Sequence, residues 1–216
     1  MPALITWWTL DVAELAPGAH SDAVQAVGAD LLRRLGEPHR RYHTDRHLVE
    51  MFWALEDLEG AGVLTARQAA VARVAAWFHD AVYDTASSGG QNELDSAALA
   101  VRDLSALGFS TDDTETVRDL VLSTQAHDLT GTPLAAAFQD ADLWILSSPP
   151  GRYHEYTVQV RDEYAAVPDD VFRAARASIL RPFLERETIY ATDFARDSWE
   201  DAARVNLAAE LGLLTG

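Results

Sequence analysis

The sequence predicts an all-α protein of roughly eight to ten helices, forming a single domain over residues 1–216. Three observations support this fold class. Apolar residues recur at spacings of three and four along most of the chain, as on one face of an α-helix. No segment alternates apolar and polar residues like a half-buried strand, and no Asn-Gly hairpin turn occurs. The breaks between helical segments are short and lie at 16–20, 37–39, 87–90, 131–133 and 147–151.

The apolar stripes can be followed in chain order. Ser21 is a candidate cap for an early helix, and Thr65 with Gln68 resembles a capping box. Ser110 and the three acidic residues soon after it predict the start of another helix, and residues 197–213 are expected to form the last. The stripes are Val24, Val27, Leu31 and Leu35; Leu48, Met51, Phe52 and Leu55; Val71, Val74, Ala75 and Phe78; Leu94, Ala97, Val101 and Leu104; Val117, Leu120 and Val121; Tyr153, Tyr156, Val160 and Tyr164; and Phe172, Ala175, Ile179 and Phe183.

Composition excludes several classes of function. The net charge of −17 disfavours a polymeric nucleic acid as partner, because its phosphates would be repelled. The chain has no cysteine, which excludes disulfides and thiolate metal sites, and all 17 basic residues are arginine, which excludes lysine Schiff-base chemistry. The first residues do not resemble a signal peptide, and no apolar run approaches the roughly 18 residues of a membrane span. We therefore expect no membrane contact and a cytoplasmic protein.

Histidines and aspartates suited to metal binding occur in four short segments beside apolar helical residues. They are RYHTDRH with His43 and His47, WFHD with His79 and Asp80, QAHD with His127 and Asp128, and FQDAD with Asp140 and Asp142. A single histidine beside apolar residues is more often a core residue than a ligand. Together, however, imidazole nitrogens and carboxylate oxygens on helices are what a divalent metal ion requires. Such an ion would also compensate the burial of the adjacent His79 and Asp80 side chains.

The order of these residues resembles the H…HD…D signature of the HD-domain superfamily of metal-dependent phosphohydrolases. The resemblance is carried by YHTDRHL, WFHDAVYD, the Asn-Glu pair at 92–93 and DADLWIL, with VRDEY at 160–164 and ARVNLAAEL at 203–211. It covers most of the chain and is nearest to the predicted metal-dependent HD phosphohydrolases of similar length. It implies an HD-domain-like helical bundle.

The resemblance also implies a set of metal ligands. They are His47, His79, Asp80 and Asp142. Asp142 is preferred to Asp140 because it is the aspartate of an AD-L run. Asp140 would then cap a helix or support a ligand.

Two further similarities imply catalytic roles. YHTDRH is similar to the histidine run of cyclic-nucleotide phosphodiesterases, which implies that His43 protonates the leaving oxygen, although position 44 is Thr rather than Asn. A purely structural hydrogen bond is the alternative for His43. HDAVYDT is similar to a run in (p)ppGpp hydrolases and implies that Asp84 orients the attacking water. Tyr83 replaces the first acid of that run, which counts against (p)ppGpp as the substrate.

Three more residues are candidates for substrate binding. Glu93 could supply the missing carboxylate or support a ligand, and His127 could bind phosphate, support a ligand or be simply buried. Arg41 is the best placed of several arginines that could bind a phosphate with two hydrogen bonds. The plainer alternatives are a solvated acid for Glu93 and a surface or salt-bridge role for Arg41. The other arginines considered are Arg40, Arg46, Arg161 and Arg176.

The sequence therefore predicts a phosphohydrolase in which metal-activated water attacks a small phosphoester, with nucleotides among the candidate substrates. Mixed nitrogen and oxygen ligands favour Mn²⁺, Fe²⁺, Co²⁺, Ni²⁺ or Zn²⁺ over Ca²⁺, with Mg²⁺ also a candidate. One alternative is a metal-stabilised nucleotide-binding or regulatory module without turnover. Another is an iron-dependent HD oxygenase, which is disfavoured because His127 is the only histidine between Asp80 and Asp142. The oligomeric state is not predicted.

Overall fold

Helices account for most of the chain in the computed structural model, which describes residues 2–87, 89–126 and 131–216. Within these ranges there are ten α-helices, one 3-10 helix and no strand, which confirms the predicted all-α class. No helix in the described ranges is long and apolar enough to cross a membrane. The elements are α1 (Pro2–Leu15), α2 (Ser21–Leu35), α3 (Asp45–Gly60), α4 (Ala66–Phe78), α5 (Gln91–Leu107), α6 (Thr111–Ser123), α7 (Pro133–Asp142), η1 (Leu143–Ser147), α8 (Pro150–Glu163), α9 (Asp169–Glu185) and α10 (Asp193–Thr215).

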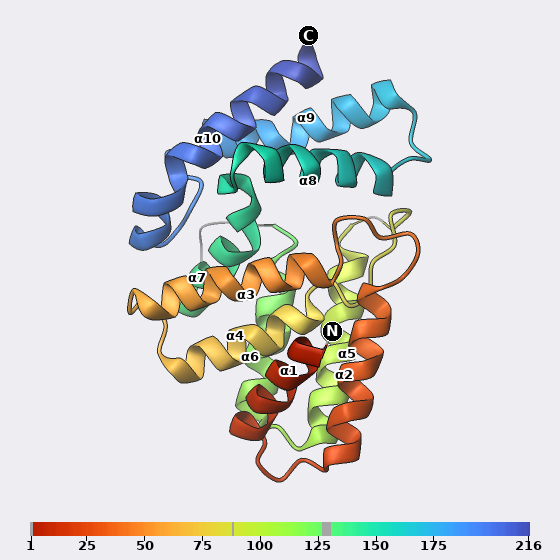
Figure 1. Cartoon of the computed structure of the whole chain (residues 1–216), viewed down its shortest axis with the longest axis vertical. Coiled ribbons are helices and arrows are strands. Elements are labelled where there is room, and N and C mark those ends of the chain that lie inside the picture. Colours follow the sequence, from red (N-terminus) through yellow and green to blue (C-terminus); the bar gives the residue numbers. More distant parts are fainter. Residues whose placement is uncertain (1, 88, 127–130) are drawn as a thin grey trace.

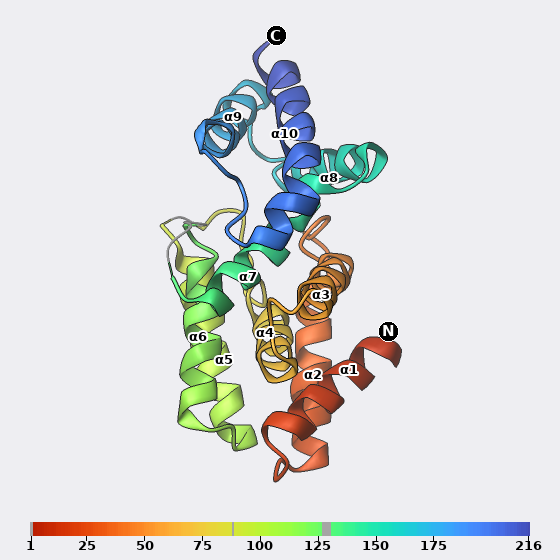
Figure 2. The ribbon, with the colours of Figure 1, turned by 90° about the vertical axis from the view of Figure 1, so that its left-hand side faces the viewer.

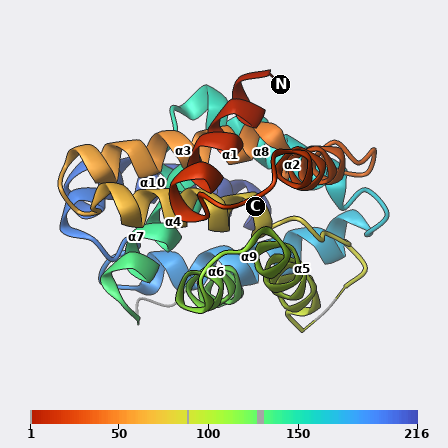
Figure 3. The same ribbon diagram turned by 90° about the horizontal axis from the view of Figure 1, so that it is seen from below.

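The helices form two layers, with α1–α6 in one layer and α8–α10 in the other (Figure 1). α7 and η1 connect the layers, and η1 packs against α10, α8 and α3. Figure 2 shows α5 and α6 side by side along one flank, with α4 between this pair and α3. Seen from below, α1 and α2 lie on the opposite side of α4 from the α5–α6 pair (Figure 3).

α4 is the buried centre of the larger layer. Its sequence is ARQAAVARVAAWF, and every residue from Ala69 to Phe78 is buried except the half-buried Arg73. A helix that is apolar on all sides must be surrounded, and α4 packs against α1, α3, α5, α6 and α7. The chain leaves this helix at Phe78, so His79 and Asp80 emerge directly from the core.

The helix starts agree with the sequence predictions in two of three places. Thr65 and Gln68 form the predicted capping box at α4, and the Ser110 side chain accepts a hydrogen bond from the Asp113 N–H at α6. The prediction for Ser21 is wrong: it is the first residue of α2, and the residue before it makes no side-chain cap. α1 was not predicted, and it is anchored where the fully buried Trp8 donates to the Val24 carbonyl at 2.8 Å.

The start of α10 is held by an aspartate from α7, and the helix begins at residue 193 rather than 197. Asp140 is 1% exposed, and its carboxylate accepts hydrogen bonds from the Ala191 and Thr192 N–H groups, both at 2.8 Å. It also accepts the Thr192 hydroxyl hydrogen at 2.7 Å. Asp140 thereby links the two layers through three hydrogen bonds.

We predict that Asp140→Ala lowers the free energy of unfolding by about 2–4 kcal/mol, because it leaves buried N–H groups without an acceptor. Urea unfolding followed by circular dichroism measures the change. The control is Asp193→Ala in the first turn of α10, whose side chain is 92% exposed. It should cost less than about 1 kcal/mol. Equal losses in both variants would contradict this account of Asp140.

Candidate functional site

Four predicted metal ligands converge where three helices meet. His47 lies in the first turn of α3, His79 and Asp80 follow α4, and Asp142 ends α7. One donor atom from each of His47, His79 and Asp80 lies within 4.8 Å of the other two. An oxygen of Asp142 lies 3.0 Å from Nε2 of His47 and 3.6 Å from Nε2 of His79. Both histidines are 4% exposed, whereas the side chains of Asp80 and Asp142 are 19% and 11% exposed.

The hydrogen bonds of the two histidines fit a metal ion. Nδ1 of His79 lies 2.8 Å from the Ala76 carbonyl, which can only accept a hydrogen bond, so Nδ1 carries a hydrogen. In the neutral ring, Nε2 therefore has the lone pair that can bind a metal ion. Nδ1 of His47 lies 3.0 Å from the Tyr42 hydroxyl. The two Nε2 atoms are 3.2 Å apart, which is unfavourable unless a proton or cation lies between them. Two imidazoles and adjacent carboxylates are suitable ligands for a divalent cation.

The Asp80 carboxylate dominates the local electrostatics. Burial alone lowers the pKa of His79, but the charge of Asp80, whose Oδ2 lies 2.8 Å from Nε2, outweighs it and raises that pKa to about 9. Burial likewise opposes the charge on Asp80, yet the neighbouring histidines lower its pKa well below the usual range. The His79 ring and the Asp80 carboxylate thus stabilise each other's charged forms.

Asp140 and Asp142 have different surroundings although they are two residues apart. Asp142 lies beside the two histidines, whereas the carboxylate oxygens of Asp140 accept hydrogen bonds from Ala191 and Thr192 at the start of α10. The position of Asp142 supports the sequence-based choice of this residue.

His43 lines the same cavity and is oriented by Glu163 of α8. Nδ1–H of His43 donates to Oε2 of Glu163 at 2.7 Å, so the ring's other nitrogen, Nε2, remains for a substrate. Burial opposes a positive charge on His43, but Asp80 and Glu163 outweigh it and raise its pKa. The Glu163 carboxylate is also buried, and the hydrogen bond and charge of His43 lower its pKa to about 2 despite that burial.

Glu163 and Arg40 hold the loop that carries His43, and sequence reasoning missed the role of Glu163. Oε1 of Glu163 accepts the N–H groups of Arg41, Tyr42 and His43 at 2.7, 2.9 and 3.0 Å. The buried Arg40 side chain donates to the carbonyls of His43 and Asp80 at 3.1 and 2.7 Å. In the sequence, Glu163 belongs to the VRDEY segment and lies seven and three residues after Tyr156 and Val160, on the same helical face.

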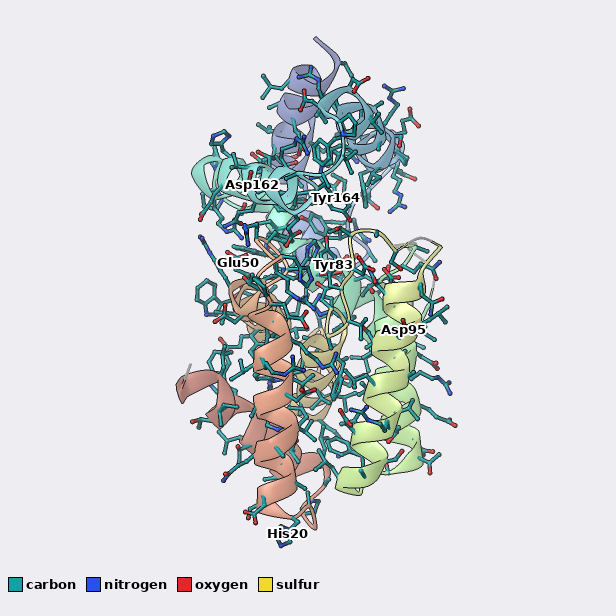
Figure 4. The ribbon with its side chains drawn as sticks, turned by 90° about the vertical axis from the view of Figure 1, so that its right-hand side faces the viewer. His20, Glu50, Tyr83, Asp95, Asp162 and Tyr164 are labelled. Carbon is teal, nitrogen blue, oxygen red and sulfur yellow. The ribbon has the colours of Figure 1, made fainter. Side chains whose placement is uncertain are left out.

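The metal-ligand candidates lie in the wall of a cavity of about 550 Å³ between the two layers. α8, α9 and η1 contribute to the wall together with α5 and the segment that follows α4, and Arg176 of α9 lies in it. Figure 4 shows Tyr83 and Tyr164 at the boundary between the layers. The Tyr83 hydroxyl contacts both Oε2 of Glu163, at 3.2 Å, and the Tyr164 hydroxyl, at 3.4 Å.

The remaining predicted residues are not all near this cavity. Glu93, in the first turn of α5, lines it. Asp84 does not line the cavity. Its side chain is exposed, and its carboxylate accepts a hydrogen bond from the Ala86 N–H at 2.9 Å, within the local turn. Arg41 is also exposed and away from the cavity, because its guanidinium donates to the carbonyls of Pro38 and Arg40. His127 lies outside the described residues.

Arg176 is the arginine that the described structure brings to the cavity. Its Nε donates to Glu210 at 2.8 Å, and its Nη2 donates to the Tyr156 hydroxyl at 2.8 Å. The sequence analysis considered Arg176 but preferred Arg41. Arg41 was preferred because it is close to His43 along the chain. The packing of α9 instead brings Arg176 into the lining of the cavity.

We predict that His79→Ala and Asp142→Asn each weaken Mn²⁺ binding by more than about 100-fold, because even losing a group behind a metal ligand costs about 10–100-fold. Equilibrium dialysis followed by elemental analysis measures the affinity. Asp84→Asn and Asp140→Asn are the matched controls and should retain binding. Loss of binding in Asp140→Asn with retention in Asp142→Asn would contradict the assignment.

We predict a pH-dependent contribution of Glu163 to stability. Folding lowers its pKa from 4.5 to about 2, so its stabilisation is complete above pH 4.5 and is lost as the pH falls towards 2. The shift corresponds to about 3 kcal/mol at neutral pH. The difference in unfolding free energy between the wild type and Glu163→Gln should therefore shrink across this pH range in urea titrations. Asp162→Asn, on the exposed side of α8, is the control and should show little difference at any pH; a constant difference for Glu163→Gln would contradict the prediction.

No family model matches the chain, and no curated protein or solved structure is significantly similar to it.

Proposed function

We propose that the protein is a metal-dependent phosphohydrolase that cleaves a small phosphoester, as the resemblance to the HD-domain superfamily implies. The observation that supports this most directly is the group formed by His47, His79 and Asp80, whose donor atoms lie within 4.8 Å of one another in the cavity wall. A divalent ion held by such residues supplies charge that polarises a phosphoryl oxygen and acidifies water.

The charge of the cavity explains why an anionic substrate would need that ion. Among the described residues that line it, Asp80, Glu93 and Asp142 carry carboxylates, and Arg176 is the single arginine. The guanidinium of Arg176 is already paired with Glu210 at 2.8 Å. A divalent cation at the His47–His79–Asp80 group would offset the charge of these carboxylates and attract a phosphate.

His43 is the proton donor in this proposal, and Glu163 is its positioning residue. Glu163 holds Nδ1–H, which fixes the ring and leaves Nε2 to protonate the leaving oxygen of the ester. The Tyr83 ring packs against His43 at a tilt of 30°, with centroids 4.2 Å apart, and further restricts its orientation. Because Asp84 faces away from the cavity, we assign it no part in orienting water.

We predict that the Mn²⁺-loaded protein hydrolyses phenyl phosphate and p-nitrophenyl phosphate, and that chelation abolishes both activities. His43→Gln should lower kcat for phenyl phosphate by about 10²–10⁴-fold, because phenolate leaves poorly without a proton. The loss should be much smaller for p-nitrophenyl phosphate, whose leaving group needs no proton. Steady-state kinetics with each ester measure the two effects, and bound metal should be unchanged.

His154→Gln is the matched control, because His154 is an exposed histidine of α8 that does not line the cavity. Equal losses for both esters in His43→Gln would contradict the role of His43 as proton donor. If the metal-loaded protein hydrolyses no phosphoester, the phosphohydrolase proposal is wrong and a binding or regulatory role becomes the better explanation.

A further inference from the structure

The cavity has two chemically different walls. The metal-ligand candidates and His43 form one wall. Across from it, the described wall contributed by α8, α9 and the segment between them is mostly apolar, and its apolar members are Val160, Val167, Phe172, Ala175 and Ile179. A ligand whose phosphate reaches the first wall must place the rest of its body near the second.

The apolar wall is accessible to a ligand. Phe172, Ala175 and Ile179 share one face of α9, since they are spaced by three and four residues. Phe172 is half-buried, and Ile179 is 57% exposed although it lines the cavity. A ligand that covers these side chains would remove their apolar surface from water, and this burial would favour binding.

Three polar side chains of the cavity already have partners within the fold. The Asn92 amide donates to the Asp84 carbonyl and accepts the Asp84 N–H, both at 3.1 Å. The Thr124 hydroxyl donates to the Val121 carbonyl at 2.8 Å, and Arg176 is paired with Glu210. Asn92 and Thr124 are thus bonded to the backbone and Arg176 to Glu210, so these three side chains offer little to a polyhydroxylated body.

We infer that the substrate is a phosphate ester of an apolar, aromatic or branched-aliphatic alcohol, with the apolar body against α9 and the phosphate at the His47–His79–Asp80 group. The inference rests on the proposed function for the identity of the phosphate head group. The cavity volume of about 550 Å³ lies within the usual range for small-molecule sites, so the body can be considerably larger than a methyl group.

Binding of two non-hydrolysable phosphonates to the full-length Mn²⁺-loaded chain tests this inference by calorimetry. Phenylphosphonate and methylphosphonate share a head group and differ in the apolar body. We expect phenylphosphonate to bind more tightly by about tenfold or more, given the apolar area that a ring covers. Equal affinities, or no binding of either compound, would overturn the inference.

Two exposed residues of α9 provide a matched pair of variants. Ile179 is 57% exposed and lines the cavity, whereas Val171 is 52% exposed and does not line it. Ile179→Ala should weaken phenylphosphonate binding by about threefold or more and leave methylphosphonate unchanged. Val171→Ala should change neither. The same effect in both variants would overturn the placement of the body against α9.

This test separates failure of the inference from failure of the proposed function. A clear preference for phenylphosphonate, without hydrolysis of any phosphoester, supports the inferred ligand class and contradicts the phosphohydrolase proposal. Hydrolysis of phosphoesters, with no preference between the two phosphonates, supports the proposed function and overturns the inference.

Discussion

The carboxylate of Glu163 is the constraint on which the arrangement of the cavity depends. It lies at the end of α8, yet it accepts three backbone N–H groups from residues 41–43 and the Nδ1–H of His43. One buried side chain therefore fixes the loop before α3, orients a cavity histidine and holds the two layers together. Burial of a carboxylate is costly, and these hydrogen bonds offset the cost. Arg40 extends the same framework from the loop to the backbone of Asp80.

The metal-ligand candidates illustrate how helix ends can concentrate polar groups beside a core. α4 is enclosed by apolar neighbours, so it contributes its polar residues only after its last turn, where His79 and Asp80 follow. Asp142 is the last residue of α7, and His47 lies near the start of α3. Each backbone segment is thus fixed by packing, and one donor atom from each of His47, His79 and Asp80 lies within 4.8 Å of the other two.

The proposed function and the inferred substrate class depend on different parts of the cavity. The proposed position of the phosphate depends on a cation at the His47–His79–Asp80 group, which would offset the charge of the lining carboxylates. Selectivity for the apolar part of the ester depends instead on α9, because Ile179 of this helix is 57% exposed and lines the cavity. Variants of α9 can therefore change which ester binds without altering the metal ligands. Variants of the ligands should affect every ester alike.

The sequence by itself determined the all-α class, because apolar periodicity and the capping signals at Thr65 and Ser110 are local properties. The resemblance to the HD-domain superfamily, not periodicity, singled out the histidines and aspartates that the fold brings together. It also favoured Asp142, which does lie beside the two histidines. It could not predict that Asp84 and Arg41 would turn to nearby backbone groups, since such local hydrogen bonds compete with a place in the cavity. Only the tertiary structure decided the role of Glu163, whose partner His43 is 120 positions away. Burial and long-range packing create that contact, whereas the helical spacing of Glu163 from Tyr156 and Val160 indicates only that this residue, unlike Asp162, faces the core.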